Sequence, residues 1–233
     1  MKKQTIVVFF YCFVAAVFLF SVHFLGHAVT VMTENQPTKR KNCIVIDAGH
    51  GGLDGGAVSC SGKPESFFNL EIACRLNDLL HFLGYDTYMI RTSDISIYTE
   101  GSTIAQKKIS DLKERVRIVN NTENALLLSI HQNTFSNSQY SGAQVFYATS
   151  QGSQMLAEQI QKCFVFELNP GSRRQSKQCQ GVYLMEHIKC PGVLIECGFL
   201  SNPEEEAKLQ SAEYQKKICC VISTSVSQFL SNT

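Results

Sequence analysis

Four titratable side chains in this sequence stand where a predicted strand ends or a predicted helix begins. His50, His131 and Glu196 each follow an apolar run, and Glu65 precedes a helix-like segment. Two imidazoles and one carboxylate are a common ligand set for zinc, with a fourth position left open for water. A further carboxylate beside that water is the usual general base of metal-assisted hydrolysis. The residue types are therefore complete for hydrolysis at a zinc site.

Each of these residues also has an ordinary structural explanation. A histidine after a strand is commonly a hydrogen-bonded structural residue, and an acidic residue before a helix is favoured by the helix dipole. Glu196 is harder to explain in this way because it follows the apolar residues Val193, Leu194 and Ile195. A carboxylate in such a strand is costly unless a metal or another partner compensates its charge. The spacing alone favours a zinc site and leaves the structural alternative open.

The glycine-rich stretch at residues 49–56 (GHGGLDGG) does not match the common nucleotide-binding motifs. A phosphate-binding loop needs Lys and Ser or Thr after its last glycine, and here Ala57 follows Gly56. The dinucleotide fingerprint also fails, because no helix is predicted to start where the pyrophosphate would bind. We expect these glycines to let the backbone pass close to a metal centre and to admit an extended substrate.

An alternating series of strands and helices must position these residues. The predicted strands are residues 43–47, 87–91, 125–131, 142–148, 182–185 and 192–196, and the predicted helices are residues 69–83, 111–121, 153–168 and 212–230, with a polar loop at 173–180. This alternation predicts an α/β fold, a single domain with a mostly parallel twisted sheet of about six strands and helices on both faces. In such sheets, the chemistry gathers at the carboxyl ends of the strands.

The first 32 residues do not belong to the predicted domain. Lys2 and Lys3 precede a run at residues 6–25 that has no charged residue. About 20 apolar residues can span a membrane, and the same pattern suits an export signal, although no clean Ala-x-Ala site follows. We predict a signal peptide or an uncleaved signal-anchor at 1–32, a polar linker at 33–42 and a catalytic domain at 43–233 outside the cytoplasm.

The charge balance excludes two classes of protein. The 233 residues include 21 Lys and Arg against 20 Asp and Glu, for a formal net charge of +1, and 44% are hydrophobic. A nucleic-acid binder usually carries a basic excess, and a disordered tail would be much poorer in apolar residues. We therefore expect a globular protein with no nucleic-acid partner.

Ten cysteines need a separate explanation. Cys12 lies in the hydrophobic run, which leaves nine cysteines in the domain, and no Cys-x-x-Cys pair is present. An odd number cannot pair completely within the chain, and most of these cysteines occupy apolar positions in predicted elements. We expect mostly buried free thiols, with Cys197 pointing to the opposite side of its strand from Glu196.

Several motifs follow one another along the whole domain. They are DAGHGG at 47–52, DGGA at 54–57, Glu65 followed by Asn69-Leu70, Leu112-x2-Arg115-x4-Asn120, SIHQN at 129–133 and LIECGFLSNPEE at 194–205. In this order and spacing they resemble the zinc-dependent N-acetylmuramoyl-L-alanine amidases of bacterial cell-wall turnover. The resemblance implies that His50, Glu65 and His131 hold Zn2+ and that Glu196 is the catalytic carboxylate. Arg115 and Asn120 are expected to brace their helix against the sheet.

Within this family the sequence is similar to the sporulation amidases of spore-forming bacteria. The supporting features are the single hydrophobic segment, the absence of a separate wall-binding module, and the segments at 100–116, 141–147 and 181–187. This implies removal of stem peptides from spore cortex peptidoglycan, so that muramic-δ-lactam can form for germination. A vegetative wall amidase, an inactive zinc-binding wall or assembly protein, and a peptidase acting on stem peptides are the alternatives.

The expected partners follow from this resemblance. The resemblance implies peptidoglycan, with the exported domain acting at the forespore cortex. The N-terminal segment adds the membrane if it stays uncleaved, and an accessory protein is a further candidate on which the sequence is silent. Asn133 lies two residues after His131 and would share its side of the strand if the strand continued. We expect Asn133 either to contact substrate or to form a turn.

Overall fold

The computed structural model describes residues 13–14, 17, 20 and 42–232 of the chain. The chain divides into two units, Met1–Arg40 and Lys41–Thr233, and the sheet with its helices belongs to the second unit. Within the described ranges, no helix is long and apolar enough to cross a membrane. Apart from four residues of the first segment and Asn42, the predicted signal segment and linker lie outside the described residues.

The second unit alternates strands and helices as the sequence predicts. The elements are β1 (Cys43–Ala48), α2 (Glu65–Phe82), β2 (Asp86–Met89), α3 (Ile104–Asn121), β3 (Ala125–Asn133), β4 (Gln144–Tyr147), α4 (Ser153–Glu167), β5 (Lys177–Gln178), α5 (Tyr183–His187), β6 (Gly192–Phe199), α6 (Pro203–Leu209) and α7 (Ala212–Asn232). The six strands form one sheet in the order β2-β1-β3-β6-β4-β5. Strands β2, β1, β3 and β6 are parallel, whereas β4 runs antiparallel to β6. The predicted α/β fold with a mostly parallel sheet is confirmed.

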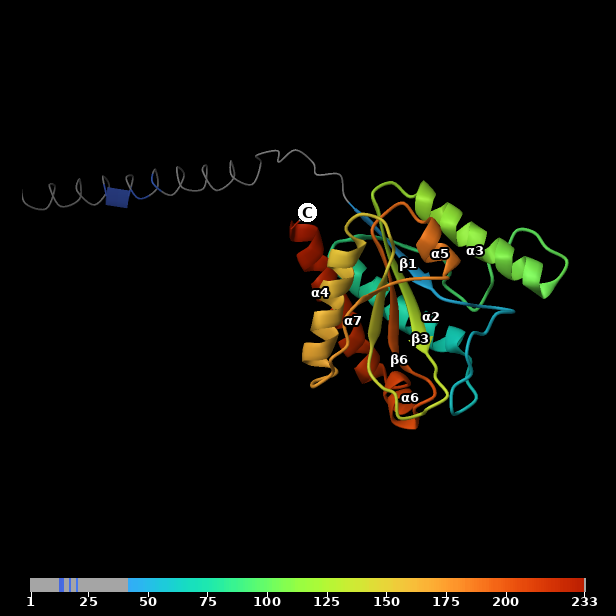
Figure 1. Ribbon diagram of the computed structural model, residues 1–233. Coiled ribbons are helices and arrows are strands. Elements are labelled where there is room, and N and C mark those ends of the chain that lie inside the picture. The colour runs from blue at the N-terminus through green and yellow to red at the C-terminus, as the bar shows by residue number, and fades with distance from the viewer. Residues whose placement is uncertain (1–12, 15–16, 18–19, 21–41, 233) are drawn as a thin grey trace, which may run out of the picture. The chain divides into compact units, whose positions relative to one another are not determined.

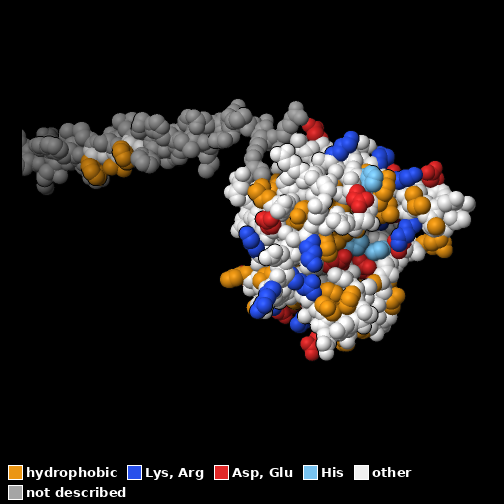
Figure 2. Space-filling model, viewed as in Figure 1, with side chains coloured by type: hydrophobic (Ala, Val, Ile, Leu, Met, Phe, Trp, Pro, Cys, Tyr) orange, Lys and Arg blue, Asp and Glu red, His pale blue; other side chains and the backbone are white. Residues whose placement is uncertain are grey.

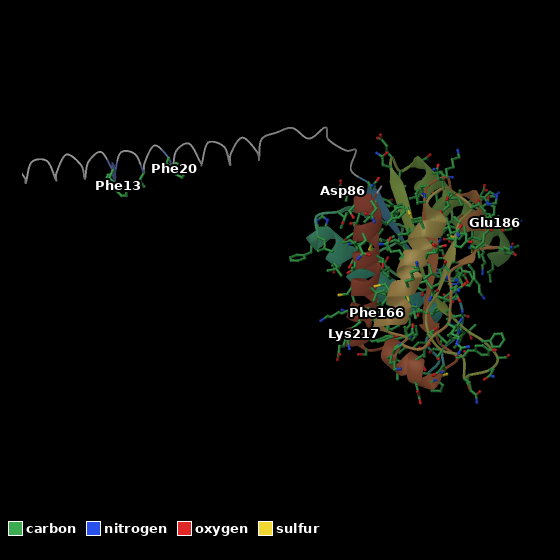
Figure 3. The ribbon with its side chains drawn as sticks, turned by 60° about the vertical axis from the view of Figure 1, so that its left-hand side comes forward. Phe13, Phe20, Asp86, Phe166, Glu186 and Lys217 are labelled. Atoms are coloured by element: carbon green, nitrogen blue, oxygen red, sulfur yellow. The ribbon has the colours of Figure 1, made fainter. Side chains whose placement is uncertain are left out.

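The two faces of this sheet are covered differently (Figure 1). We call the face covered by α2, α4 and α7 the closed face, and the face covered by α3 and α5 the open face. In Figure 3, Lys217 of α7 and Glu186 of α5 lie on opposite sides of the domain. Because side chains alternate along a strand, each central strand serves both faces. In β3, Leu128 and Ile130 pack in the closed-face core, and Leu127 packs on the open face.

The open face becomes polar toward the carboxyl ends of its strands. Val45, Leu127 and Leu194 lie in its small core. Two residues further along each strand, and therefore on the same side, come Asp47, Ser129 and Glu196, which line a cleft. Cys197 is buried in the closed-face core, which confirms that it points away from Glu196. The alternation therefore separates a packed interior from a line of polar groups.

Three stretches differ from the sequence-based prediction, and one of them is Pro203–Leu209, which forms the unpredicted helix α6. Residues 182–185 were expected to form a strand, but Tyr183–His187 form the short helix α5, and residues 177–178 of the expected loop form β5. A short apolar run cannot distinguish a strand from one buried helical turn. Here Leu184 and Met185 are buried against the open-face core, so one helical turn covers its edge.

The cysteines agree only partly with their prediction. All nine cysteines of the described range are free. Three of them (Cys179, Cys197 and Cys219) are buried, four are half-buried, and Cys60 and Cys220 are exposed. Cys220 sits in α7 beside the buried Cys219, and neighbouring helix positions point in different directions.

Candidate metal centre and active site

Two parallel strands and one helix bring His50, Glu65 and His131 together. Their ligand atoms all lie within 4.8 Å of one another. His50 Nε2 is 3.3 Å from Glu65 Oε2, and His131 Nδ1 is 2.9 Å from Glu65 Oε1. Strands β1 and β3 are neighbours, so residues at their carboxyl ends meet at one edge of the sheet, where α2 begins with Glu65. The three predicted ligands thus form one cluster.

Two glycines make this close approach possible. A Cβ atom on Gly49 would lie 2.2 Å from His131 Nε2, and one on Gly56 would lie 2.6 Å from Glu65 Oε2. Such distances leave no room for a side chain. His50 itself has a φ of 61°, a left-handed conformation that is uncommon outside glycine. This geometry agrees with the expectation that the glycines let the backbone pass close to the cluster.

Both carboxylate oxygens of Glu65 are held by several donors. Oε1 accepts hydrogen bonds from Asn69 Nδ2 and from the Gln132 backbone N–H, each at 3.1 Å. Oε2 accepts a hydrogen bond from the Ala57 backbone N–H at 3.1 Å. Burial alone would raise the pKa of Glu65, but its contacts with the two histidines outweigh burial and hold that pKa well below its usual range. Glu65 is therefore ionised and rigidly placed.

His50 is oriented by a carboxylate that the sequence analysis did not select. Asp54 Oδ2 lies 2.9 Å from His50 Nδ1 and 3.1 Å from Lys108 Nζ. Burial would lower the pKa of His50, but the contacts with Glu65 and Asp54 raise it. A carboxylate on the second ring nitrogen is the usual way to orient a histidine ligand. The only sequence signal for Asp54 was its place inside the glycine-rich stretch 49–56, as the first residue of the DGGA motif.

A buried arginine ties helix α3 to the same edge of the sheet. Arg115 forms ion pairs with Asp47 of β1 and with Asp111, and its Nη2 donates a hydrogen bond to the His50 carbonyl at 2.8 Å. Arg115 thus braces α3 against β1, as expected. Asn120 instead contacts the end of α5 and the segment after it. Its Nδ2 donates a hydrogen bond to the His187 carbonyl, and its Oδ1 accepts one from the Lys189 N–H.

Glu196 differs from Glu65 in its surroundings. Glu196 pairs in register with His131 across β3 and β6 and is half-buried. Its Oε2 atom is buried and has no hydrogen-bond partner among the described residues. Burial raises the pKa of Glu196 to about 7; Glu65 adds to the shift, and the two histidines oppose it. A buried carboxylate with an unpartnered oxygen and a pKa near neutrality can both accept and return a proton.

A cleft on the open face connects these groups. It has a volume of about 450 Å³, and His50, His131 and Glu196 are among its lining residues. Figure 2 shows histidine and acidic side chains gathered in the middle of one face, with basic and hydrophobic side chains around them. Glu65 lies behind the two histidines and is 4% exposed, which suits a ligand better than a residue that touches substrate.

Asn133 lies outside this arrangement. The register between β3 and β6 shifts between His131 and Asn133, because β6 advances three residues there while β3 advances two. Asn133 is not among the described residues that line the cleft, and its carbonyl accepts a hydrogen bond from the Leu200 N–H. Its contact with substrate stays a prediction.

The donor set fits a zinc ion. Two imidazole nitrogens and one ionised carboxylate converge on one point, and a carboxylate base lines the same cleft. Residues 44–228 match the family model described as N-acetylmuramoyl-L-alanine amidase. The chain belongs to this amidase family. The predicted family is thereby confirmed, and with it N-acetylmuramoyl-L-alanine amidase activity on peptidoglycan.

Individual members of the amidase family show the extent of this similarity. The chain is 40% identical over 184 residues to the germination-specific N-acetylmuramoyl-L-alanine amidase of Bacillus subtilis, covering 77% of this chain and 76% of that protein. It is 33% identical over 177 residues to the amidase LytC of Bacillus subtilis, covering 75% of this chain but 32% of LytC. The solved CwlD amidase from Clostridioides difficile, in complex with the GerS lipoprotein, superposes with a TM-score of 0.79 at 36% identity, covering 83% of this chain and 100% of that one.

Proposed function

We propose that this amidase hydrolyses the bond between the lactyl group of muramic acid and L-alanine with Glu196 as its general base and His50, Glu65 and His131 as ligands of zinc. The observation that carries the proposal is the buried, unpartnered oxygen of Glu196 in the cleft that both histidines line. A purely structural glutamate would find a partner for that oxygen.

The bound ion would supply a Lewis acid that polarises the amide carbonyl and acidifies the attacking water. Glu196 takes the proton of that water and returns it to the leaving L-alanine nitrogen. In the metal-free site, burial raises the pKa of Glu196 to about 7, and a nearby zinc ion would favour the ionised form that accepts the proton. Asp54 keeps His50 in position, and Asn69 does the same for Glu65.

Charge also fits an uncharged amide substrate. The carboxylates of Glu65 and Glu196 together balance the two positive charges of a zinc ion. The scissile muramyl amide carries no charge, so it enters a site without net charge and without electrostatic repulsion.

We further propose that the substrate is spore cortex peptidoglycan and that the reaction prepares muramic-δ-lactam formation. Support comes from the germination-specific relative, which this chain matches over most of both lengths, in contrast to the partial match with LytC. The CwlD amidase was solved with a lipoprotein, which supports an accessory protein as a partner of this chain as well. Export to the forespore cortex, by a cleaved or retained N-terminal segment, belongs to the same proposal.

Digestion of purified peptidoglycan tests the reaction and the substrate together. Cortex and vegetative peptidoglycan are incubated with the full chain, and the products are identified by mass spectrometry. We expect a free L-alanine amino terminus beside an intact sugar, faster release from cortex, loss after chelation and recovery with zinc. Cleavage within the stem peptide would identify a peptidase instead, and equal rates on both substrates would favour vegetative wall turnover.

A further inference from the structure

Among the described residues, the cleft contains one lysine that has neither an ion-pair partner nor a role in the proposed mechanism. Among the described residues that line it, the cations besides histidine are Lys107, Lys108 and Arg115. Arg115 is paired with two aspartates, and Lys108 is paired with Asp54. Lys107 forms no ion pair with any described residue. Its positive charge is therefore available to a ligand.

Lys107 is also held in place. It lies in the first turn of α3, where Thr103 and Gln106 form a reciprocal capping box. Its Nζ is 5.0 Å from the centre of the Tyr98 ring, and Tyr98 lines the same cleft. A cation–π contact orients an ammonium group without neutralising it. Lys107 is half-buried, so its side chain is already restricted in the free protein and loses less conformational entropy when a ligand binds.

The position of Lys107 is linked to the reaction centre. Its neighbour Lys108 contacts Asp54 at 3.1 Å, and Asp54 contacts His50 at 2.9 Å. Lys108 thus links α3 to the carboxylate that orients His50. Because Lys107 and His50 line the same cleft, a ligand group at Lys107 would share that cleft with the scissile bond.

The chemistry of the substrate selects the ligand. The glycan strand is uncharged, and the lactyl carboxyl of muramic acid is consumed in the amide bond. The stem peptide beyond L-alanine carries free carboxylates. An unpaired, pre-oriented ammonium group in the cleft therefore complements the peptide and not the sugar.

We propose that Lys107, positioned by Tyr98, forms a subsite for a stem-peptide carboxylate on the leaving-group side of the amide. This inference rests on the proposed function, because it places the reacting amide at Glu196. It assigns Lys107 a role in substrate specificity and none in the chemical step.

The test uses two muropeptides that differ only in whether the carboxyl of the second stem residue is free or amidated. Full-length wild-type protein with zinc should show a kcat/KM about five- to tenfold higher for the free acid, the size expected for one partly exposed charged contact. Lys107→Met should lose this preference, mainly through KM, and Lys107→Arg should restore it. Lys113→Met removes an exposed lysine of the same helix and should keep the preference.

Binding of the same two muropeptides, measured by titration calorimetry, separates this inference from the proposed function. Suppose that the wild type hydrolyses neither muropeptide but binds the free acid more tightly, and that Lys107→Met loses this difference in binding. The catalytic assignment then fails and the subsite stands. If hydrolysis proceeds and Lys107→Met keeps the full preference, or wild type shows none, the subsite is wrong.

Discussion

The closed and open faces of the sheet use the same strands for different purposes. On the closed face, α2, α4 and α7 cover an almost continuous apolar core. On the open face, α3 and the short α5 cover a smaller core and leave a cleft at the carboxyl ends of the strands. The closed face accounts for most of the buried apolar side chains that stabilise the fold. The open face tolerates buried charge, which is useful for catalysis.

The two carboxylates of the site show the same contrast at atomic scale. Glu65 begins α2 and has donors on both oxygens, so its charge is satisfied. Glu196 lies on the open face, and its Oε2 has no partner among the described residues. A ligand must stay ionised and fixed, whereas a base must change its protonation. The contrast between the two faces can be tested with substitutions that change the activity and the stability by different amounts.

The largest effect is expected on the open face, at Glu196. Glu196→Gln should lower kcat by about 10²- to 10⁴-fold, the usual contribution of general-base catalysis. It should not lower the free energy of unfolding, because it removes a buried charge without a partner. Muropeptide hydrolysis, zinc content and denaturant unfolding measure the three quantities. Glu204→Gln, at an exposed position of α6, is the control, and near wild-type turnover in Glu196→Gln would refute the assigned role.

Matched leucine truncations compare the faces directly. Leu156→Ala in α4 removes a fully buried side chain of the closed face, and Leu184→Ala in α5 removes one that borders the cleft. We expect Leu156→Ala to cost about 3–5 kcal/mol and Leu184→Ala about 2–3 kcal/mol, because the open site relaxes more easily. Leu184→Ala alone should raise KM. Equal costs in urea unfolding would contradict the distinction between the two faces.

A smaller, pH-dependent effect is expected at Asp47. Burial opposes its ionisation, but Arg115 and Ser129 hold the pKa of Asp47 below its usual value. A carboxyl with a lowered folded-state pKa contributes stability above its unfolded pKa of about 3.9, and this is lost as pH falls through the folded pKa.

Asp47→Asn should therefore cost about 2–3 kcal/mol at pH 7, less than a complete loss of the pair because Asp111 still contacts Arg115. The difference from wild type should shrink as pH falls below about 4. Unfolding curves across pH measure it. Asp78→Asn, at an exposed position of α2, should change the unfolding free energy by less than about 0.5 kcal/mol. A difference that does not vary with pH would show that the ion pair is not its source.

The smallest effect is expected at Gly49, where the backbone passes close to the candidate metal ligands. In Gly49→Ala the new Cβ would displace the His131 ring, so zinc affinity should fall by about 10- to 100-fold, as for a disturbed ligand environment. Competition with a chelator measures this affinity. Gly62→Ala is the control. Gly62 has a positive φ, and an added Cβ would have no atom within 4 Å, so the substitution should lower stability and leave zinc affinity unchanged. Unaltered zinc binding in Gly49→Ala would mean that His131 is not a ligand.

Prediction from the sequence succeeded where a local pattern carries the information. The apolar runs before His50, His131 and Glu196 located the strands β1, β3 and β6, although β3 continues to Asn133 and β6 to Phe199, and the mostly parallel sheet followed from the alternation of strands with helices. It failed at residues 182–185, where four apolar residues are too few to define a period. It also missed Asp54 as the partner of His50, since an aspartate between glycines is common in turns.

The sequence by itself determined which side chains are available for hydrolysis and at which strand ends they stand, because residue type and hydrophobic period are local properties. Only the tertiary structure decided that Glu65 has a donor on each oxygen while Glu196 keeps one oxygen without a partner. It alone left Lys107 as the unpaired cation among the described residues of the cleft. Burial and partners depend on segments far apart in the chain, so the same residue types acquire different protonation and different roles.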